Sequence, residues 1–346
     1  MNYQKIDEFV LRLVEDSTPE RTVWNMEKIR EGKPASWNYI DGCMLTALME
    51  MEGITGDERY SRFVRACADH FVGEDGSIRT FKPEAHNLDD INEGRVLFEL
   101  YRRTGEEKYR KAADFLRQRL AEQPRTQEGN FWHKAIYPNQ VWLDGIYMAQ
   151  PFYALYEKHF GDGDCSDTVE QIKTVRSRMF SEEKGLYFHG YDASKTAFWA
   201  DPDTGCSKNF WLRSLGWFAV ALADLLDILP EGEGRDSLRD IFTELMASVS
   251  GYTPATVDYS LEQSGSWGKA GRVCMTNATT KTIDNKRVSL RLSTCEKGGS
   301  RIGGVIVLSV LFFPIGLLSG LMKGSNPQIE QGTVLNTTVS QEIVVE

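Results

Sequence analysis

The sequence Thr55-Gly-Asp-Glu-Arg-Tyr60 recurs 49 residues later as Thr104-Gly-Glu-Glu-Lys-Tyr109. After each copy the apolar residues fall at i, i+3, i+4, i+7 and i+11, from Tyr60 to Phe71 and from Tyr109 to Leu120. This spacing places one apolar stripe along a helix and predicts a helix with a single buried face. The same spacing returns between residues 238 and 249.

The segments between these one-faced helices are apolar on more than one side, and a helix with little polar surface must be enclosed by others. These segments are residues 37–51, 90–101, 141–156 and 211–228. The alternation, at intervals of about 50 residues, predicts stacked helical hairpins. An open solenoid and a closed toroid of inner and outer helices both satisfy it. The long connections 125–140 and 186–210 favour the toroid, because long loops in a compact domain are usually functional.

The net charge of the chain bears on its binding partners, and its cysteine content bears on its cellular compartment. The chain has 346 residues and a formal net charge of −10. This charge argues against a nucleic-acid partner, because polyphosphate binding needs a basic face. Six cysteines without a C-x-x-C pair, and residues 1–11 without the features of a secretory signal, predict reduced thiols and a cytoplasmic location.

The last hundred residues differ from the rest. Residues 1–250 hold 31 Lys+Arg and 43 Asp+Glu, a net of −12, whereas residues 251–346 hold 9 and 7, a net of +2. We interpret 1–250 as one helical domain, 251–301 as a Ser/Thr/Gly-rich basic linker without assigned structure, and 323–346 as a short polar tail.

The segment 302–322 contains 21 residues without a charge, which is long enough to cross a hydrocarbon core of roughly 30 Å at ~1.5 Å per residue. It is a candidate transmembrane helix, with a buried core helix as the alternative. Five basic residues lie between 286 and 301 and one follows at 323. This asymmetry predicts a cytoplasmic leading domain, anchored through the span.

Aromatic and titratable residues gather in the connections and at the starts of the enclosed helices, which converge on one mouth in a toroid. They are Tyr39, Asp89, His133, Lys134, Trp142, Asp144, His189, Trp211, Arg213 and Trp217. Tryptophan rings stack on sugar rings and arginine pairs with carboxylates. The set therefore suits an acidic saccharide.

Each of these residues also has a structural interpretation. Asp89 could be the N-cap of a helix, and His133 and His189 could be structural histidines. Asp144 lies in an otherwise apolar run, where burial should raise its pKa as a proton donor requires. Arg213 and Trp217 are four residues apart and share a helix face. The sequence has no phosphate loop, Ser-His-Asp order or metal-spaced ligand set, so it predicts no cofactor.

Five motifs resemble those of the unsaturated glycuronyl hydrolases, glycoside hydrolase families 105 and 88, over about residues 5–250. They are His86-Asn-Leu-Asp89, Phe131-Trp-His-Lys134, Asn139-Gln-Val-Trp-Leu-Asp-Gly145, Gly185-Leu-Tyr-Phe-His-Gly190 and Asn209-Phe-Trp-Leu-Arg-Ser-Leu-Gly-Trp217. The closer match is to the family 105 unsaturated rhamnogalacturonyl hydrolases. The resemblance implies an all-α fold, an (α/α)6 barrel of inner and outer helices.

The resemblance also implies a reaction on lyase products of pectin or rhamnogalacturonan, which end in a C4=C5 unsaturated uronic acid. An acid protonates C4, water adds at C5, and the resulting hemiketal opens and releases the next sugar. Asp144 matches the family's acid/base and Asp89 its second carboxylate. Positions around the unsaturated sugar are matched by His189, Trp211, Arg213 and Trp217, with His133 and Trp142 nearby. No metal or organic cofactor is implied.

The sequence departs from the family after residue 250. About nine helices precede that point, whereas the family fold has twelve, so we expect a barrel that is incomplete at its C-terminal end, followed by an unrelated tail. One alternative is therefore an inactive, membrane-tethered remnant that at best binds acidic sugars. Another is a helical-barrel sugar epimerase, which would need paired histidines that the sequence does not show.

Overall fold

The computed structural model describes residues 3–250, 255–262, 272–281, 287–297 and 338–339. The chain divides into two compact units. The first comprises Met1–Phe180, His189–Ser207 and Gly216–Thr243. The second comprises Ser181–Phe188, Lys208–Leu215 and Glu244–Glu346.

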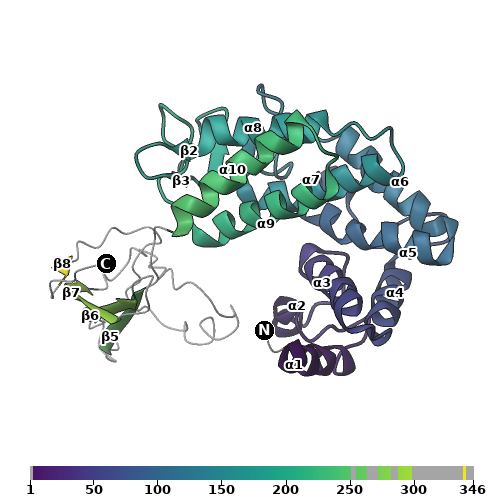
Figure 1. Ribbon diagram of the computed structural model, residues 1–346, viewed down its shortest axis with the longest axis horizontal. Helices are drawn as coiled ribbons and strands as arrows, with labels where there is room; N and C mark the ends of the chain where they lie inside the picture. Colours follow the sequence, from purple (N-terminus) through teal and green to yellow (C-terminus); the bar gives the residue numbers. More distant parts are fainter. Residues whose placement is uncertain (1–2, 251–254, 263–271, 282–286, 298–337, 340–346) are drawn as a thin grey trace. The chain divides into compact units, whose positions relative to one another are not determined.

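Helices dominate the residues up to 250, as predicted (Figure 1). They are α1 (Tyr3–Glu15), α2 (Met26–Glu31), α3 (Tyr39–Thr55), α4 (Arg59–Phe71), α5 (Val96–Thr104), α6 (Glu107–Ala121), α7 (Leu143–His159), α8 (Ser166–Met179), α9 (Leu212–Ile228) and α10 (Glu233–Ser250). Two 3-10 helices, η1 (Pro83–Ala85) and η2 (Leu88–Arg95), precede α5. The enclosed segments predicted from the sequence correspond to α3, η2 with α5, α7 and α9.

The repeated Thr-Gly motif is the corner between an enclosed helix and the next one-faced helix. Thr55 and Thr104 donate their hydroxyls to the carbonyl four residues earlier, at 2.8 and 2.7 Å. Gly56 and Gly105 follow with φ of 73° and 69°, the left-handed conformation that ends a helix at low cost for glycine. The motif therefore terminates α3 and α5 in the same way.

The tyrosine that closes each copy anchors the following helix in the core. Tyr60 and Tyr109 are fully buried. Their hydroxyls each donate to a carboxylate at 2.6 Å, Tyr60 to Asp7 of α1 and Tyr109 to Asp69 of α4. A buried hydroxyl needs such a partner. The tyrosine of the first copy thus links α4 to α1, and that of the second links α6 to α4.

Helix η2 lies between α3 and α7 and packs against both. Its contact with α3 is so close that a Cβ on Gly42 would stand 2.6 Å from Glu93 Cα. Periodicity predicted an ordinary helix over 90–101, but the structure has the tighter 3-10 form up to Arg95 and an α-helix only from Val96. Residues 88–95 position one face of the candidate site.

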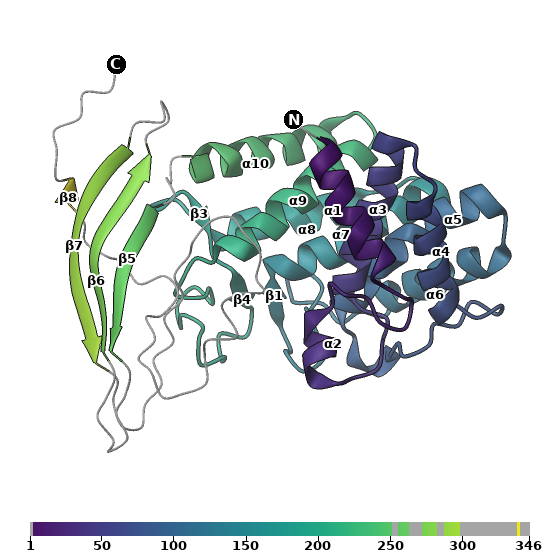
Figure 2. The same cartoon turned by 90° about the horizontal axis from the view of Figure 1, so that it is seen from below.

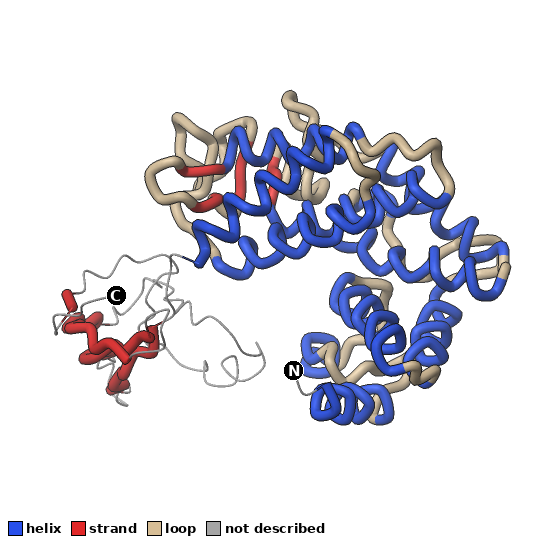
Figure 3. The backbone as a smooth tube through the Cα atoms, in the orientation of Figure 1, coloured by secondary structure: helices blue, strands red, loops and turns tan. Residues whose placement is uncertain are grey.

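Two short pairs of strands connect the helices (Figure 3). Strand β1 (Gln140–Trp142) pairs antiparallel with β4 (Gly190–Asp192), so that Trp142 lies opposite Gly190. Strand β2 (Phe180–Ser181) pairs with β3 (Leu186–Tyr187). The strand signal seen at 185–190 is thus divided between β3 and the start of β4.

The second unit contains a four-stranded sheet in the order β5-β6-β7-β8, whose strands lie side by side (Figure 2). The strands are β5 (Ala255–Glu262), β6 (Arg272–Lys281), β7 (Arg287–Lys297) and β8 (Thr338–Val339), all antiparallel to their neighbours. The composition of 251–301 predicts a linker, whereas the structure has β5, β6 and β7 there. The signal was present, because apolar residues alternate at Val257, Tyr259 and Leu261 and at Val288, Leu290 and Leu292.

Two features of the chain bear on its environment. Over the residues that the structure describes, no helix has both the length and the apolar character needed to cross a membrane. The predicted span 302–322 lies outside those residues. Cys43, Cys67, Cys165 and Cys206, the cysteines of the described helical part, are free thiols.

Candidate active site

Asp89 lies on η2 and is held by a lysine from a distant loop. Asn87, not Asp89, caps η2, because its side-chain oxygen accepts the backbone N–H of Asp89 at 3.2 Å. The N-cap interpretation of Asp89 was therefore wrong. The Asp89 carboxylate is mostly buried and instead forms an ion pair with Lys134, whose Nζ lies 2.7 Å away. Two of the predicted site residues, Lys134 and Asp89, are therefore in direct contact.

His133 approaches the same carboxylate from the other oxygen. Two backbone hydrogen bonds hold His133 in this position. Leu88 N donates to the His133 carbonyl at 3.1 Å, and His133 N donates to Gln140 O at 2.8 Å. His133 Nε2 lies 3.7 Å from Asp89 Oδ1, and the residue is 3% exposed. Burial lowers the pKa of His133 to about 4, and the nearby Asp89 charge opposes this shift. The imidazole is therefore neutral near pH 7.

Trp142 fixes the orientation of His133. The two rings stack with centroids 4.9 Å apart and planes 10° apart, and Tyr137 stacks on the same indole at 5.1 Å. Trp142 Nε1 donates to Gln140 Oε1 at 3.1 Å. The predicted Trp142 is thus present beside His133, with its flat surface engaged by protein rings.

Asp144 is the second residue of α7 and is 9% exposed. On one side, Leu143 N donates to His189 O at 3.1 Å, which places the backbone of His189 beside the start of α7. On the other side, a Cβ on Gly145 would stand 2.6 Å from His133 Nδ1 and 3.2 Å from Leu88 Cδ1. The glycine after Asp144 therefore leaves room for His133, and the starts of α7 and η2 lie against each other.

Asp90 was not singled out from the sequence, although it is part of the same charged group. Burial raises the pKa of Asp90 to about 6; the Asp89 charge adds to the rise, and Asn87, Lys134 and Lys28 act against it. The sequence signal that could have identified Asp90 is its position next to Asp89 at the start of an enclosed segment. The raised pKa makes Asp90 easier to protonate than an ordinary carboxyl, beside a candidate catalytic carboxylate.

The predicted aromatic residues Tyr39 and Trp217 contact each other, and Trp217 also contacts Tyr147. Trp217 stacks on Tyr147 with centroids 4.9 Å apart and contacts Tyr39 edge-on at 6.5 Å. Arg95, almost fully buried, donates to the Tyr147 hydroxyl at 3.0 Å and to Asp224 Oδ2 at 2.6 Å. Tyr147 and Arg95, which sequence reasoning missed, thus join α7, η2 and α9 beneath Trp217.

The structure gives separate ring contacts to the three remaining predicted residues. The ring of His189 is tilted against Trp199 at 6.3 Å. Trp211 and Arg213 belong to the second unit, where the Arg213 guanidinium lies 3.7 Å above the Trp211 ring. Arg213 is exposed in the first turn of α9. The described side chains include no group of three or more His, Cys, Asp or Glu placed to hold a metal ion.

Paired helices with carboxylates, a neutral histidine and stacked aromatic rings at their starts define a helical-barrel type of carbohydrate enzyme. A family model, described as Glycosyl Hydrolase Family 88, matches residues 14–257. The chain belongs to this family.

Three relatives illustrate the similarity. A family 105 glycoside hydrolase of C. acetobutylicum ATCC 824 is 39% identical, with a TM-score of 0.61 over 62% of this chain and 61% of that chain. A 24.9 kDa protein in the picA locus of Rhizobium radiobacter is 33% identical over 30% of this chain and 44% of its own length. An unsaturated 3S-rhamnoglycuronyl hydrolase of Formosa agariphila is 24% identical over 47% of this chain and 49% of its own length. The chain thus spans about half the length of the curated relatives it matches.

Proposed function

We propose that this chain hydrolyses oligosaccharides that end in a C4=C5 unsaturated uronic acid, the products of pectin or rhamnogalacturonan lyases, with rhamnose as the leaving sugar. The observation that supports the proposal is the close packing of Gly145, the residue after Asp144 at the start of α7, against the neutral His133, which itself lies next to the Asp89–Lys134 ion pair. Membership of the family supports the same reaction class.

In the proposed reaction, Asp144 transfers its proton to C4 of the enol ether. Positive charge develops at C5 and the ring oxygen, and a water molecule adds its oxygen to C5 while its proton returns to Asp144. The hemiketal then opens and the leaving sugar departs with its glycosidic oxygen. Protonating carbon first differs from the usual glycosidase route, in which two carboxylates act at the anomeric carbon.

The other residues hold the sugar in the proposed site. Asp89, oriented by Lys134, accepts hydrogen bonds from sugar hydroxyls. Trp217 and Tyr39 present aromatic surface to the ring, and Arg213 pairs with the uronate carboxylate. His189 and Trp211 complete the surroundings, and the proposal needs no cofactor.

The test follows the ultraviolet absorbance of an unsaturated galacturonyl-rhamnose disaccharide, which disappears when C4=C5 is hydrated. Asp144→Asn removes the proton and keeps the shape, so we expect turnover to be abolished while calorimetric binding and the helical circular dichroism are retained. Unchanged turnover in this variant would refute the role of Asp144. Wild-type protein that binds the disaccharide without consuming its absorbance would favour the inactive sugar-binding alternative.

A further inference from the structure

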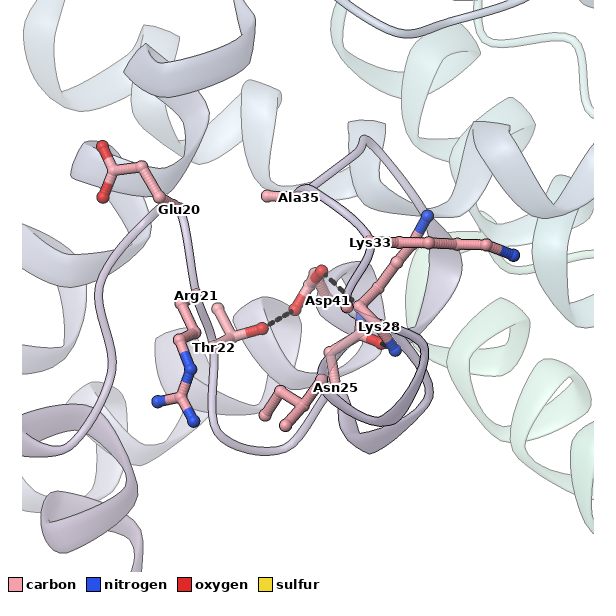
Figure 4. Close-up of a pocket in the computed structure, with 10 residues that line it drawn as sticks. Glu20, Arg21, Thr22, Asn25, Lys28, Lys33, Ala35 and Asp41 are labelled. Atoms are coloured by element: carbon pink, nitrogen blue, oxygen red, sulfur yellow. Dashed lines mark hydrogen bonds between the residues drawn. The ribbon is translucent and has the colours of Figure 1, made fainter.

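The segment between α1 and α3 encloses a pocket of about 360 Å³ that none of the proposed catalytic residues lines (Figure 4). We call it the loop pocket. Helix α2 forms one wall with Lys28, the preceding turn contributes Arg21 and Thr22, and Asp41 of α3 lies at its base. Its volume falls within the range of small-molecule sites, roughly 300–1,000 Å³.

The acid at the base of the loop pocket is already saturated with donors. Thr22 Oγ1 and Trp24 Nε1 each donate to Asp41 Oδ1 at 2.7 Å. Asn25 and Asn38 donate their side-chain amides to Oδ2 at 3.0 and 2.6 Å. A carboxylate has about four acceptor positions, so Asp41 has none left for a ligand. Its role is to hold the pocket wall in place, as the dashed bonds in Figure 4 show for Thr22 and Asn25.

The groups that remain for a ligand are mainly cationic donors. Lys28 is half-buried, and no ion pair within the described part of the chain engages its ammonium group. Arg21 is exposed at the opposite side and likewise has no carboxylate partner there. Of the other charged lining residues, Lys33 pairs with Glu31 at 2.6 Å and Glu20 lies 3.3 Å from His70. Donors with few competing acceptors select an anionic ligand, and a planar carboxylate suits an arginine and a lysine together.

Two hydrogen bonds connect η2, which carries Asp89, to the chain between Ala35 and Asp41, two residues that line the loop pocket. Trp37 Nε1 donates to Asp90 O at 2.6 Å, and Asn38 N donates to Glu93 Oε2 at 2.7 Å. Asn38 is also one of the donors to Asp41. Lys28 is near enough to Asp90 for its charge to act on that carboxyl. The chain that lines the pocket is therefore bonded directly to the element that carries Asp89.

We propose that the loop pocket is a subsite for a carboxylate on the leaving part of the substrate, with Lys28 and Arg21 as its charged contacts. This inference rests on the proposed function, because it assigns the acidic oligosaccharide that extends from the cleaved bond. The chemical class is a uronic acid oligomer with a second carboxylate beyond the unsaturated sugar. Substrates that end after one neutral leaving sugar would leave the pocket empty.

The experiment measures binding by calorimetry, so that it does not depend on turnover. The probes are trigalacturonate and its methyl ester, which has the same sugars without the charges. The full chain should bind trigalacturonate more tightly, and Lys28→Gln should weaken that binding about tenfold, about 1.4 kcal/mol. This loss lies at the lower end for a hydrogen bond to a charged group, because Lys28 is only half-buried. Binding of the methyl ester should not change.

Lys33→Gln is the matched control, because Lys33 lines the same pocket but is exposed and paired with Glu31. It should leave the affinity for trigalacturonate within about twofold. The proposal is overturned if Lys28→Gln binds trigalacturonate like the wild type, if it loses equal affinity for both probes, or if the wild type does not distinguish them. Failure of the proposed function is a separate result, in which the charge-selective loss is present but the unsaturated disaccharide is not consumed.

Discussion

Gly42→Ala adds one methyl group to α3 where η2 leaves no space for it. A Cβ at this position would stand 2.6 Å from Glu93 Cα, 2.7 Å from Glu93 N and 2.8 Å from Asn92 Oδ1. Ordinary contact begins at 3.4 Å, so the two segments must separate by about 0.8 Å. Two of the three atoms belong to the backbone of η2, and no side-chain rotation can relieve the overlap.

We expect this substitution to lower the free energy of unfolding by about 3 kcal/mol, the upper part of the usual range for overpacking. The displacement should also reach the candidate site, because η2 carries Asp89 next to the residues that must move. Activity on the unsaturated disaccharide should therefore fall in the fraction of protein that remains folded. Urea unfolding followed by far-ultraviolet circular dichroism measures the stability, and absorbance loss measures the activity.

Gly53→Ala is the matched control on the same helix. Gly53 is exposed, and a Cβ there would meet nothing within 4 Å. Alanine is favoured over glycine within a helix, so stability should rise by about 0.5–1 kcal/mol. The two variants thus make the same chemical change, and we expect Gly42→Ala to lower the free energy of unfolding and Gly53→Ala to raise it. A Gly42→Ala protein whose stability lies within 0.5 kcal/mol or so of the wild type would refute the close-packing argument.

Two further predictions concern charge. Arg213→Ala should raise KM for the charged disaccharide by a factor that corresponds to about 1.5–3 kcal/mol, and an equal effect on its methyl ester would show that Arg213 is structural. His133, with its pKa lowered from 6.5 to about 4, makes stability rise with pH between those values, since the unfolded state binds more protons there. Asp90, with its pKa raised from 3.8 to about 6, makes stability fall over nearly the same window, since the folded state binds more protons. Each contribution is on the order of 3 kcal/mol, so the two nearly cancel in the wild type; Asp90→Asn should make stability rise with pH from 4 to 6, and His133→Phe should make it fall. Urea unfolding at several pH values measures both slopes, and parallel slopes for the two variants would contradict the assignment.

The helical part of the fold was predictable because its signals are local in the chain. The Thr-Gly corners hydrogen-bond within four residues, and the stripe that begins at Tyr109 is buried along its whole length. The positions of Asp144 and Tyr39 at helix starts follow from the same local pattern. Alternation in 255–261 and 288–292 was an equally local signal, but the Ser, Thr and Gly content around it suggested a linker.

The partners of the site residues could not be predicted, because they are distant in sequence. Arg95 and Asp224 are 129 residues apart, and nothing near either one indicates the other. The sequence left Asp89 ambiguous between a cap and a functional carboxylate, and it gave no sign of the contact with Lys134. The fourfold saturation of Asp41 likewise depends on donors from a loop whose course has no periodic pattern. Tertiary contacts decide the roles of polar residues that local propensity leaves open.

The charges around Asp89 determine what the proposed recognition of an acidic sugar requires from other residues. Lys134 is paired with Asp89 at 2.7 Å, and His133 is neutral near pH 7, so this group offers no net positive charge to a uronate. Asp90, with a pKa of about 6, adds negative charge as the pH rises above that value. If the chain acts as we propose, this group repels the carboxylate of an incoming substrate unless cations outside the group offset the repulsion. Arg213 in the first turn of α9 and Lys28 in the loop pocket are the cations to which our proposals assign this role. Their removal should therefore weaken binding of charged sugars more than it affects the proton transfer, which is the division of roles that the two substitutions test.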